Sequence, residues 1–348
     1  MFVIATAFAE EYHSHRVLEM LKNIPDMTWT PSIPERFKGY TIEDMKSVYS
    51  QKTMPKHTAQ NVTYRAVDLP TTFSWLEQKP ECLKVRDQGS CGSCWAMSAV
   101  GSFSDNRCIQ GKDATRVTYS EQYEISCDHI DRGCEGGNLH FDVSFMKKNG
   151  VPTDKCVSYK SGNDGRKRAC PTKCDDGSAI PAHFKIDKYE NVCHGEESIM
   201  AALTKGTVQT GFTVYSDFNY YTSGIYQHKF GAIEGGHAVV IVGYGEQNGV
   251  KYWDVRNSWG PAWGEKGYFR IMNSDRWVCL WRNAYIRISS VQDGLCNILL
   301  WIYKYVSFAL AFSCEVELLY FISLKCHLSC QFFEQLFCKW LNSFLTTG

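Results

Sequence analysis

Residues 87–100 read DQGSCGSCWAMSAV, and this stretch holds two cysteines, Cys91 and Cys94, separated by a glycine and a serine. A C-x-x-C pair can be a redox dithiol, half of a metal site, or a different arrangement that shares the spacing. Ser93 is of a residue type that favours a helix N-cap. Apolar residues follow it at helical spacing: Ala96, Ala99, Val100 and Phe103. The pattern predicts a helix that begins at Cys94 and packs inward along those positions.

Five residues, two of them in this stretch, form a candidate set for nucleophilic catalysis. In the first turn of a helix, Cys94 would meet partial positive charge and N–H groups that lower the pKa of a thiol. His237 opens a strongly apolar strand, GGHAVVIVGYG, where a polar ring is costly without a role. Asn257 ends another strand and can orient that imidazole, with Trp259 shielding the hydrogen bond from water. Gln88 can donate its amide to a developing oxyanion, together with the backbone N–H of Cys94.

The composition excludes some classes of function. Lys plus Arg and Asp plus Glu each total 37, so the chain lacks a global basic field of the kind that binds nucleic acid. Its 16 cysteines favour an oxidising compartment. The apolar start carries a small-x-small triplet, Ala7-Phe8-Ala9, which predicts a signal peptide over residues 1–9; the alternative is a disordered apolar start. The expected location is the secretory pathway, in a lysosome-like vacuole or outside the cell.

The zones that follow differ in pattern. Residues 10–67 are polar and predict one helix over 41–49, opened by the capping-box pattern T-x-x-D. Residues 68–205 are helical in pattern and rich in cysteine. Residues 207–290 switch to short β-branched and aromatic strands with glycine-rich breaks, typical of an antiparallel barrel or sheet. A helical half followed by a β half predicts an α+β fold with two subdomains and a ligand site in the cleft between them.

The last zone, residues 291–348, changes character. It contains an apolar run at 295–314 whose one charge is Lys304, so the run is long enough for a membrane span. Glu315 and Glu317 end the run, and no basic cluster flanks it. Three interpretations stay open: a membrane anchor, a poorly ordered extension, or translated sequence that is not native to the gene.

QGSCGSCW, with GGHAV and RNSWG downstream, resembles the signature of the papain-like cysteine proteases over roughly residues 68–290, the predicted catalytic domain. The resemblance implies an α+β, papain-like two-subdomain fold: a helical left domain, an antiparallel β-barrel right domain, and an active-site cleft between them. It implies that Cys94 is the nucleophile, activated by His237, that Asn257 orients the imidazole, and that Gln88 contributes to the oxyanion hole. It implies no metal and no organic cofactor.

Three other functions compete with a protease. A dithiol oxidoreductase would need Cys91 and Cys94 to pair reversibly, but no thioredoxin-like βαβ pattern surrounds them. A zinc site would need a second C-x-x-C or an H-x₃₋₅-H pair, which does not accompany the first. A catalytically silent papain-like binding protein is disfavoured because all four mechanistic residues are present.

Within this family the sequence is most similar to the cathepsin B branch, in DLPTTFSW, VYSDFNYYTSGIYQH and the cysteines near 156–174. The resemblance implies four disulfides, each worth about 2–4 kcal/mol. They pair Cys91 with Cys134, Cys127 with Cys170, Cys156 with Cys174 and Cys82 with Cys108. Cys193 and Cys279 are left over within the domain, and we expect both to be buried thiols.

Residues 10–67 fit a short cathepsin B-type propeptide, which lies backwards through the cleft and inhibits the enzyme. Trp29, Phe37 and Tyr40 are its expected aromatic anchors, and maturation is expected near residues 65–69. The alternative is a flexible N-terminal extension. The catalytic domain that follows is expected to act as a monomer on protein or peptide substrates.

The chain departs from cathepsin B in the loop that closes the cleft. Cathepsin B carries an occluding loop with a His-His pair, which blocks the primed end of the cleft and captures a substrate C-terminus. Here the span between Cys156 and Cys170, VSYKSGNDGRKRA, is short and lacks histidine. We therefore expect an open cleft, and an endopeptidase without dipeptidyl carboxypeptidase activity.

A second departure concerns substrate specificity. The segment CEGG, with Gly136 and Gly137, matches the lining of the non-primed side, and Trp259 is also assigned to the substrate-binding surface. Where cathepsin B has an acidic residue in the S2 pocket, VCLWRNAY places Ala284. The S2 pocket is therefore expected to be small and apolar and to prefer Leu, Val or Phe at P2. Its expected lining is Leu139, Gly211, Ala238 and Ala284.

Overall fold

The computed structural model describes residues 11–49, 68–192, 195–273 and 286–292. Several sequence predictions fall outside these residues: the signal peptide at 1–9, the S2 residue Ala284, the leftover Cys193 and Cys279, and the tail beyond Gln292. They remain predictions. Within the described ranges, no helix is long and apolar enough to cross a membrane.

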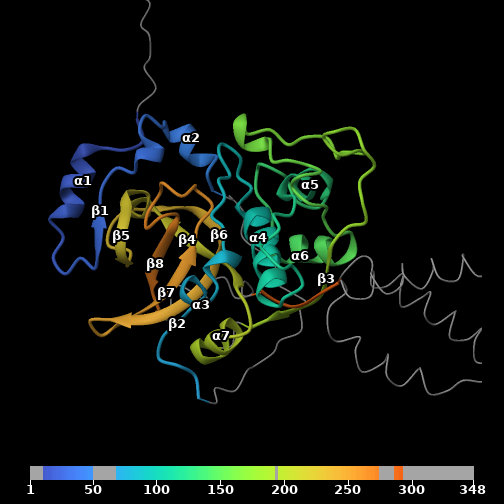
Figure 1. The fold of residues 1–348 in the computed structure, drawn as a ribbon. Helices are drawn as coiled ribbons and strands as arrows, with labels where there is room; N and C mark the ends of the chain where they lie inside the picture. The colour runs from blue at the N-terminus through green and yellow to red at the C-terminus, as the bar shows by residue number, and fades with distance from the viewer. Residues whose placement is uncertain (1–10, 50–67, 193–194, 274–285, 293–348) are drawn as a thin grey trace, which may run out of the picture. The chain divides into compact units, whose positions relative to one another are not determined.

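The helix α4 (Cys94–Ile109) begins at the predicted residue and lies at the centre of the helical part of the fold (Figure 1). Its N-cap is Ser93, as predicted, but the serine side chain does not cap the helix. The Ser93 hydroxyl instead lies 2.9 Å from the hydroxyl of Tyr159. The sequence predicted that one face of this helix packs inward. In the structure nearly every residue of α4 is buried, by the sheet and by two neighbouring helices, so the buried surface is wider than predicted.

The remaining helices are short (Figure 1). They are α1 His15–Lys22, α2 Ile42–Lys46, α3 Trp75–Gln78, α5 Glu121–Cys127, α6 Leu139–Lys148 and α7 Glu196–Leu203, with 3₁₀ turns at Glu35–Phe37, Pro80–Cys82, Ser161–Asn163 and Ser216–Tyr220. The helices α5 and α6 both contact α4. The cysteine-rich half of the sequence therefore forms a small helical subdomain around α4.

The strands form one mixed sheet in the order β1-β5-β8-β7-β6-β4-β9-β3, with β2 paired on β6. Their bounds are β1 Trp29–Pro31, β2 Phe73–Ser74, β3 Lys185–Asn191, β4 Val208–Tyr215, β5 Tyr221–Tyr226, β6 Ile233–Gln247, β7 Val250–Arg256, β8 Tyr268–Met272 and β9 Ile286–Gln292. The described strand pairs are antiparallel apart from β5 with β8, which is parallel. The β6–β7 hairpin lies between these two strands in the chain and supplies the crossover connection that a parallel pair needs. The predicted antiparallel sheet therefore contains one parallel pair.

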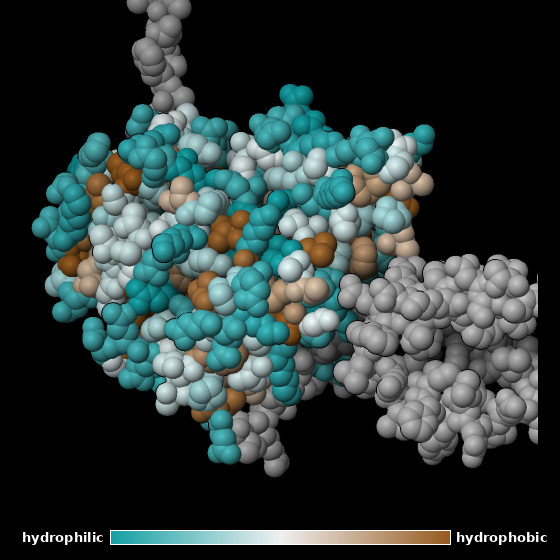
Figure 2. Space-filling view, viewed as in Figure 1, coloured by the Kyte–Doolittle hydropathy of each residue, from teal (hydrophilic) through white to brown (hydrophobic). Residues whose placement is uncertain are grey.

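Buried hydrophobic residues form two main clusters. One combines the sheet with residues 11–49 and includes Leu18, Trp29 and Phe37. The other surrounds α4 and includes Cys94 and Ala238. On the face shown in Figure 2, exposed hydrophobic residues form small, separate patches among hydrophilic ones. The two clusters match the predicted α+β fold of two subdomains.

Residues 11–49, which we call the N-terminal segment, pack against the sheet (Figure 1). The strand β1 pairs antiparallel with β5, with Trp29 opposite Gly224. The indole N–H of Trp29 donates to the backbone carbonyl of Gln227 at 2.9 Å. The predicted anchor Trp29 is therefore both buried and hydrogen-bonded, and the segment is not a detached extension.

The predicted capping box at the start of α2 is present. The Asp44 backbone N–H donates to Thr41 Oγ1 at 3.2 Å, and the Thr41 backbone N–H donates to an Asp44 carboxylate oxygen at 2.9 Å. The predicted helix over 41–49 is too long, since α2 ends at Lys46. Two residues later the carbonyl of Val48 accepts a hydrogen bond from the Gln88 side chain.

The four disulfides that the resemblance implies are all present: Cys82–Cys108, Cys91–Cys134, Cys127–Cys170 and Cys156–Cys174. The Cys91–Cys134 bond occupies the sulfur that a redox dithiol would need. Cys94 takes part in none of the described disulfides and is buried. A dithiol oxidoreductase is therefore disfavoured on structural grounds.

Candidate active site

His237 and Asn257 meet where β6 and β7 lie side by side. His237 Nε2 lies 2.7 Å from Asn257 Oδ1, and the backbone N–H of Ser258 donates to the same oxygen at 2.8 Å. This second donor orients the amide with its oxygen toward the imidazole. Because the oxygen can only accept, Nε2 carries the proton and Nδ1 of the neutral ring is an acceptor. Nδ1 is buried and makes no hydrogen bond within the described residues.

The surroundings of His237 favour the uncharged imidazole. Burial lowers the pKa of His237 to about 4; the hydrogen bond to Asn257 opposes this shift, and the positive charge of Arg36 adds to it. The ring of Trp259 lies 4.7 Å from the imidazole, tilted by 30°, and is itself buried. The indole thus lies where the sequence predicted it, beside the His237–Asn257 hydrogen bond.

Cys94 enters the same region from the helical subdomain. It is the first residue of α4, and α4 packs against β6, the strand that carries His237. Cys94 and Ala238 belong to one buried cluster, so the thiol and the residue after the histidine share an environment. At the N-terminus of a long helix, the helix dipole favours the thiolate form.

Gln88 is fully buried, and the whole of its carboxamide is hydrogen-bonded. Nε2 donates to the backbone carbonyls of Val48 and Cys91, each at 3.0 Å. Oε1 accepts from the Ser258 hydroxyl at 2.7 Å. The contact to Ser258, which sequence reasoning missed, ties the amide to the loop that follows Asn257. One amide N–H of Gln88 therefore points at a peptide carbonyl of the N-terminal segment.

Aromatic residues of the N-terminal segment cover the histidine. The Tyr49 ring lies 6.3 Å from the His237 ring and 5.9 Å from the Trp259 ring, both edge-on. Phe37 packs edge-on against Trp259 at 5.2 Å, and Tyr40 packs on Phe37 at 5.4 Å. The predicted anchors Phe37 and Tyr40 therefore belong to this cover, and Tyr49 is a further one that the sequence did not single out.

The loop before α4 shows the direction in which the N-terminal segment runs. At one end of the loop, Asp87 forms a β-bridge with Trp259, the ring on which the phenylalanine of the segment packs. At the other end, Gly92 forms a bridge with the CEGG segment, and a Cβ on Gly92 would lie 3.1 Å from the carbonyl oxygen of Ser47. The N-terminal segment therefore passes from the Trp259 end toward the CEGG end.

Three of the four residues predicted to line S2 are described. Leu139 and Ala238 share the buried cluster around α4. Gly211 lies directly opposite Ala238 in the β4–β6 ladder. Ala284 lies outside the described residues. The three described positions are buried, and their place in an S2 pocket stays a prediction.

The two glycines of CEGG are required by their surroundings. Gly136 has φ of +103°, a backbone conformation that favours glycine. A side chain on Gly137 would collide with the indole of Trp95, the residue after Cys94. Gly137 thus allows the CEGG segment to lie directly against the start of α4.

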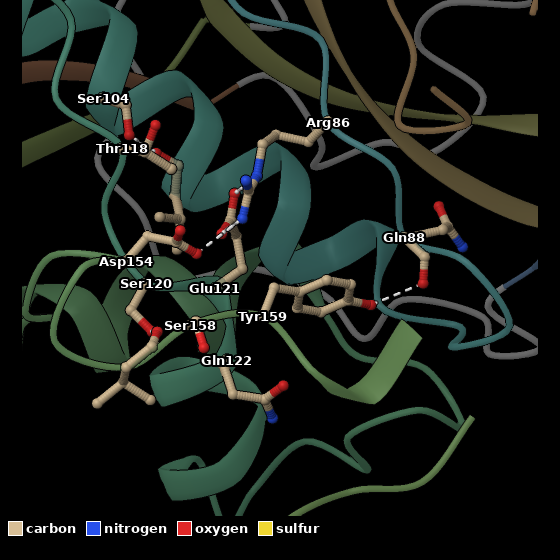
Figure 3. Close-up of polar contacts among 12 residues, drawn as sticks. Arg86, Gln88, Ser104, Thr118, Ser120, Glu121, Gln122, Asp154, Ser158 and Tyr159 are labelled. Atoms are coloured by element: carbon tan, nitrogen blue, oxygen red, sulfur yellow. Dashed lines mark hydrogen bonds and ion pairs between the residues drawn. The ribbon is translucent and has the colours of Figure 1, made fainter. Parts of the chain in front are cut away.

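The short loop between Cys156 and Cys170 packs against the loop that contains Gln88. The Tyr159 hydroxyl donates to the backbone carbonyl of Gln88 at 2.7 Å (Figure 3). It also lies 2.9 Å from the Ser93 hydroxyl. The backbone N–H of Ser90 donates to the carbonyl of Gly162 at 2.8 Å. Sequence reasoning missed Tyr159, since nothing local marks it as a neighbour of a residue 71 positions away.

Comparisons with known proteins agree with this geometry. Residues 69–293 match the model of the papain family cysteine proteases. The chain is 46% identical over 274 residues to a cathepsin B-like protein, CP3, of Giardia intestinalis, covering 77% of this chain and 91% of that one. It is 28% identical over 291 residues to cathepsin B of Dictyostelium discoideum, covering 79% and 93%. The solved structure of procathepsin B S9 from Trypanosoma congolense superposes with a TM-score of 0.75 at 24% identity, covering 82% of this chain and 100% of that one.

The family model spans more than half of the chain, and the segment before it lies over the histidine of the site. The chain therefore belongs to the papain family of cysteine proteases, in its cathepsin B-like branch, and is made as a proenzyme.

Proposed function

We propose that the chain hydrolyses peptide bonds through Cys94, His237, Asn257 and Gln88. His237 Nδ1 takes the thiol proton of Cys94, and the thiolate attacks the carbonyl carbon of the scissile bond. The electron pair of the C=O bond moves to its oxygen, where the Gln88 amide and the Cys94 backbone N–H stabilise the charge. His237 then gives its proton to the leaving amine. A water that loses its proton to His237 attacks the thioester, and the released thiolate is reprotonated.

The hydrogen bond from Gln88 Nε2 to the carbonyl of Val48, at 3.0 Å, carries this proposal. An amide that already holds a peptide carbonyl in a buried position is suited to hold the carbonyl of a substrate. The hydrogen bond from His237 to Asn257 supports the proposed base, because it fixes the tautomer that leaves Nδ1 as acceptor. No metal and no organic cofactor takes part in the proposed steps.

We propose that residues 10–67 act as an intramolecular inhibitor. The carbonyl of Val48 takes the amide N–H of Gln88 that the substrate carbonyl would need, and Tyr49 lies over His237. The segment runs from Trp259 toward CEGG, opposite to the direction proposed for a substrate, so its own peptide bonds are presented backwards. Cleavage near residues 65–69 is the proposed maturation step.

An endopeptidase activity without dipeptidyl carboxypeptidase activity is supported by the loop between Cys156 and Cys170. The loop packs against the residues that follow Gln88, through Tyr159 and Gly162, and it contains no histidine. The chain thus lacks, in this loop, the cationic pair that would bind a substrate's C-terminal carboxylate. We propose cleavage within chains rather than stepwise removal of C-terminal dipeptides.

The proposed substrates are proteins or peptides with Leu, Val or Phe at P2. The apolar character of Leu139, Gly211 and Ala238 supports this preference, since none of them carries a charge that could pair with an arginine. The four disulfides support an oxidising compartment, so the proposed location is a lysosome-like vacuole or the cell exterior. We propose that the mature enzyme acts as a monomer.

Hydrolysis of an internally quenched peptide with Leu at P2 tests this function. We compare the acid-activated chain with Cys94→Ser, His237→Ala and, as a matched control, His183→Ala at a half-buried histidine outside the site. The proposal predicts internal cleavage by the wild type and His183→Ala, and a loss of at least about 10³-fold in kcat for the other two. A folded, processed chain that binds the peptide without cleaving it would instead support the silent binding protein.

A further inference from the structure

Asp87 lies at the end of the cleft away from the CEGG segment. It directly precedes Gln88 and forms a β-bridge with Trp259, whereas the other end of the same loop bridges to CEGG. If CEGG lines the non-primed side, Asp87 lies beside the residues of a substrate that follow the scissile bond. Its carboxylate Oδ1 accepts from the backbone N–H of Gly89 at 2.8 Å, which holds the side chain in one orientation.

The N-terminal segment places a cation on this carboxylate. Arg36 Nη1 donates to Asp87 Oδ2 at 2.5 Å, and Arg36 Nη2 approaches the carbonyl oxygen of Gly89 at 3.4 Å. The side chain of Arg36 is only 10% exposed, and the next residue, Phe37, packs on Trp259. The guanidinium is therefore seated in the cleft between the carboxylate and a backbone carbonyl.

In the described part of the catalytic domain, no other cationic side chain is paired with Asp87. The neighbouring Arg86 points its guanidinium the other way, to Glu121 at 2.9 Å and Asp154 at 2.8 Å (Figure 3). Within the described residues, the ion pair of Asp87 is with Arg36 alone. The Asp87 side chain is 48% exposed even with Arg36 in place. When the N-terminal segment leaves, the carboxylate therefore loses the one ion-pair partner that it has among the described residues.

We infer that Asp87 and the carbonyl of Gly89 form a primed-side subsite for a cationic side chain, arginine above lysine, C-terminal to the scissile bond. This inference rests on the proposed peptidase function and names a class of substrate for it. Two acceptors on different groups suit the planar fork of a guanidinium better than the single ammonium of lysine. In the proenzyme, Arg36 occupies the subsite that a substrate arginine fills in the mature enzyme.

The test compares arginine with citrulline, its uncharged near-isostere, in internally quenched peptides that share Leu at P2. The residue is placed in turn at P1′, P2′ and P3′, and the concentration of active enzyme is set by titration with an epoxysuccinyl inhibitor. At one of these positions we expect kcat/KM to be about fivefold to tenfold higher for arginine, and the ratio to fall as salt is raised. The expected ratio for lysine against citrulline is smaller.

Amino-acid substitutions test whether Asp87 causes the preference for arginine. Asp87→Asn should bring the arginine-to-citrulline ratio to about 1, and Asp87→Glu should keep most of it, since it retains the charge. Asp164→Asn, which removes a nearby exposed carboxylate paired with Arg168, should leave the ratio unchanged. If Asp87→Asn fails to mature, the arginine-to-citrulline ratio of the wild type and its salt dependence still decide whether the subsite exists.

The results distinguish a failure of the proposed subsite from a failure of the proposed peptidase function. An enzyme that titrates and cleaves but shows no preference for arginine at any primed position overturns the subsite. So does a preference that survives in Asp87→Asn. A preparation that the inhibitor does not titrate and that cleaves neither peptide overturns the proposed peptidase function instead.

Discussion

The side-chain amide of Gln88 donates a hydrogen bond to the backbone carbonyl of Val48 across 3.0 Å, and this contact joins the N-terminal segment to the catalytic domain at its site. The second amide proton of Gln88 is committed to the carbonyl of Cys91, and its oxygen to the hydroxyl of Ser258. The amide is therefore fixed by its own domain and presents one N–H to whatever carbonyl enters the cleft.

Replacing Gln88 by alanine should lower kcat by about 10²-fold with little change in KM, because the amide acts mainly on the oxyanion of the transition state. Steady-state kinetics of the acid-activated enzyme measures both parameters. Gln78→Ala, at an exposed position on α3, is the control and should behave as wild type. A loss confined to KM would show that Gln88 binds the substrate in its ground state.

Tyr159→Phe should lower kcat by about tenfold while leaving the fold intact. The substitution keeps the buried ring but removes the hydroxyl that holds the Gln88 backbone and contacts Ser93, so the two oxyanion donors lose their shared support. Because Tyr159 acts through Gln88, its effect should shrink in a Gln88→Ala background, which a double-mutant cycle measures. Tyr123→Phe removes a hydroxyl of the same subdomain that contacts neither residue, and serves as control. Equal losses in both backgrounds would contradict a positioning role.

Arg36→Gln should raise the pKa of His237 in the proenzyme. Burial lowers the pKa of His237 to about 4, and the charge of Arg36 lowers it further because a second cation nearby disfavours the imidazolium. NMR titration of the His237 ring, in a Cys94→Ser proenzyme that cannot process itself, measures the shift. Lys38→Gln removes an exposed charge of the same segment and should leave the titration unchanged. The N-terminal segment would then inhibit electrostatically as well as by covering the site.

Two buried carboxyl groups should make the protein more stable in acid. Neither carboxylate oxygen of Glu124 has a hydrogen-bond partner among the described residues, and Asp142 Oδ2 accepts from Gln209 at 2.9 Å. Burial raises the pKa of both groups well above the ordinary value, and the charge of Asp142 adds to the shift of Glu124. The folded protein then holds these protons more tightly than the unfolded chain. The stability that these two groups contribute is therefore fully present below pH about 4 and is lost as pH rises toward the raised pKa values.

Glu124→Gln replaces one of these two ionisable groups by an amide that is neutral at every pH. We expect its free energy of unfolding to exceed that of the wild type by about 1–3 kcal/mol at pH 7 and to match it near pH 4. Chemical denaturation of the disulfide-intact Cys94→Ser proenzyme at the two pH values gives the comparison. Glu77→Gln, at an exposed carboxyl on α3, is the control. A Glu124→Gln protein no more stable than wild type at pH 7 would contradict the account.

Short-range sequence patterns predicted the elements that depend on neighbouring residues. The start of α4 at Cys94 and the capping box at Thr41 follow from residue types a few positions apart. His237 and Asn257 could be singled out because each is a polar residue at the predicted start or end of an apolar strand, and adjacent strands bring such residues together. Asn257 does follow the end of β7, whereas His237 lies inside β6, which begins earlier, at Ile233. These predictions needed no knowledge of long-range packing.

Other features depend on contacts between distant parts of the chain and left no local signal. Val48 and Gln88 are 40 positions apart, and Arg36 and Asp87 are 51 apart. The end of α2 is also unmarked locally: after Lys46 the backbone continues with shorter-range hydrogen bonds, Ser47 to Asp44 and Val48 to Met45, and the Val48 carbonyl then accepts from Gln88. The parallel pairing of β5 with β8 likewise depends on the hairpin that separates them in sequence.

The proposed mechanism requires that Cys94, rather than Cys91, carries the reactive thiol. Acid-activated protein is labelled with an epoxysuccinyl inhibitor, and the modified residue is located by peptide mass mapping. The account predicts one adduct, on Cys94, that is lost in Cys94→Ala, with Cys91 still bonded to Cys134. The absence of an adduct, with Cys91 found bonded to Cys94, would contradict it.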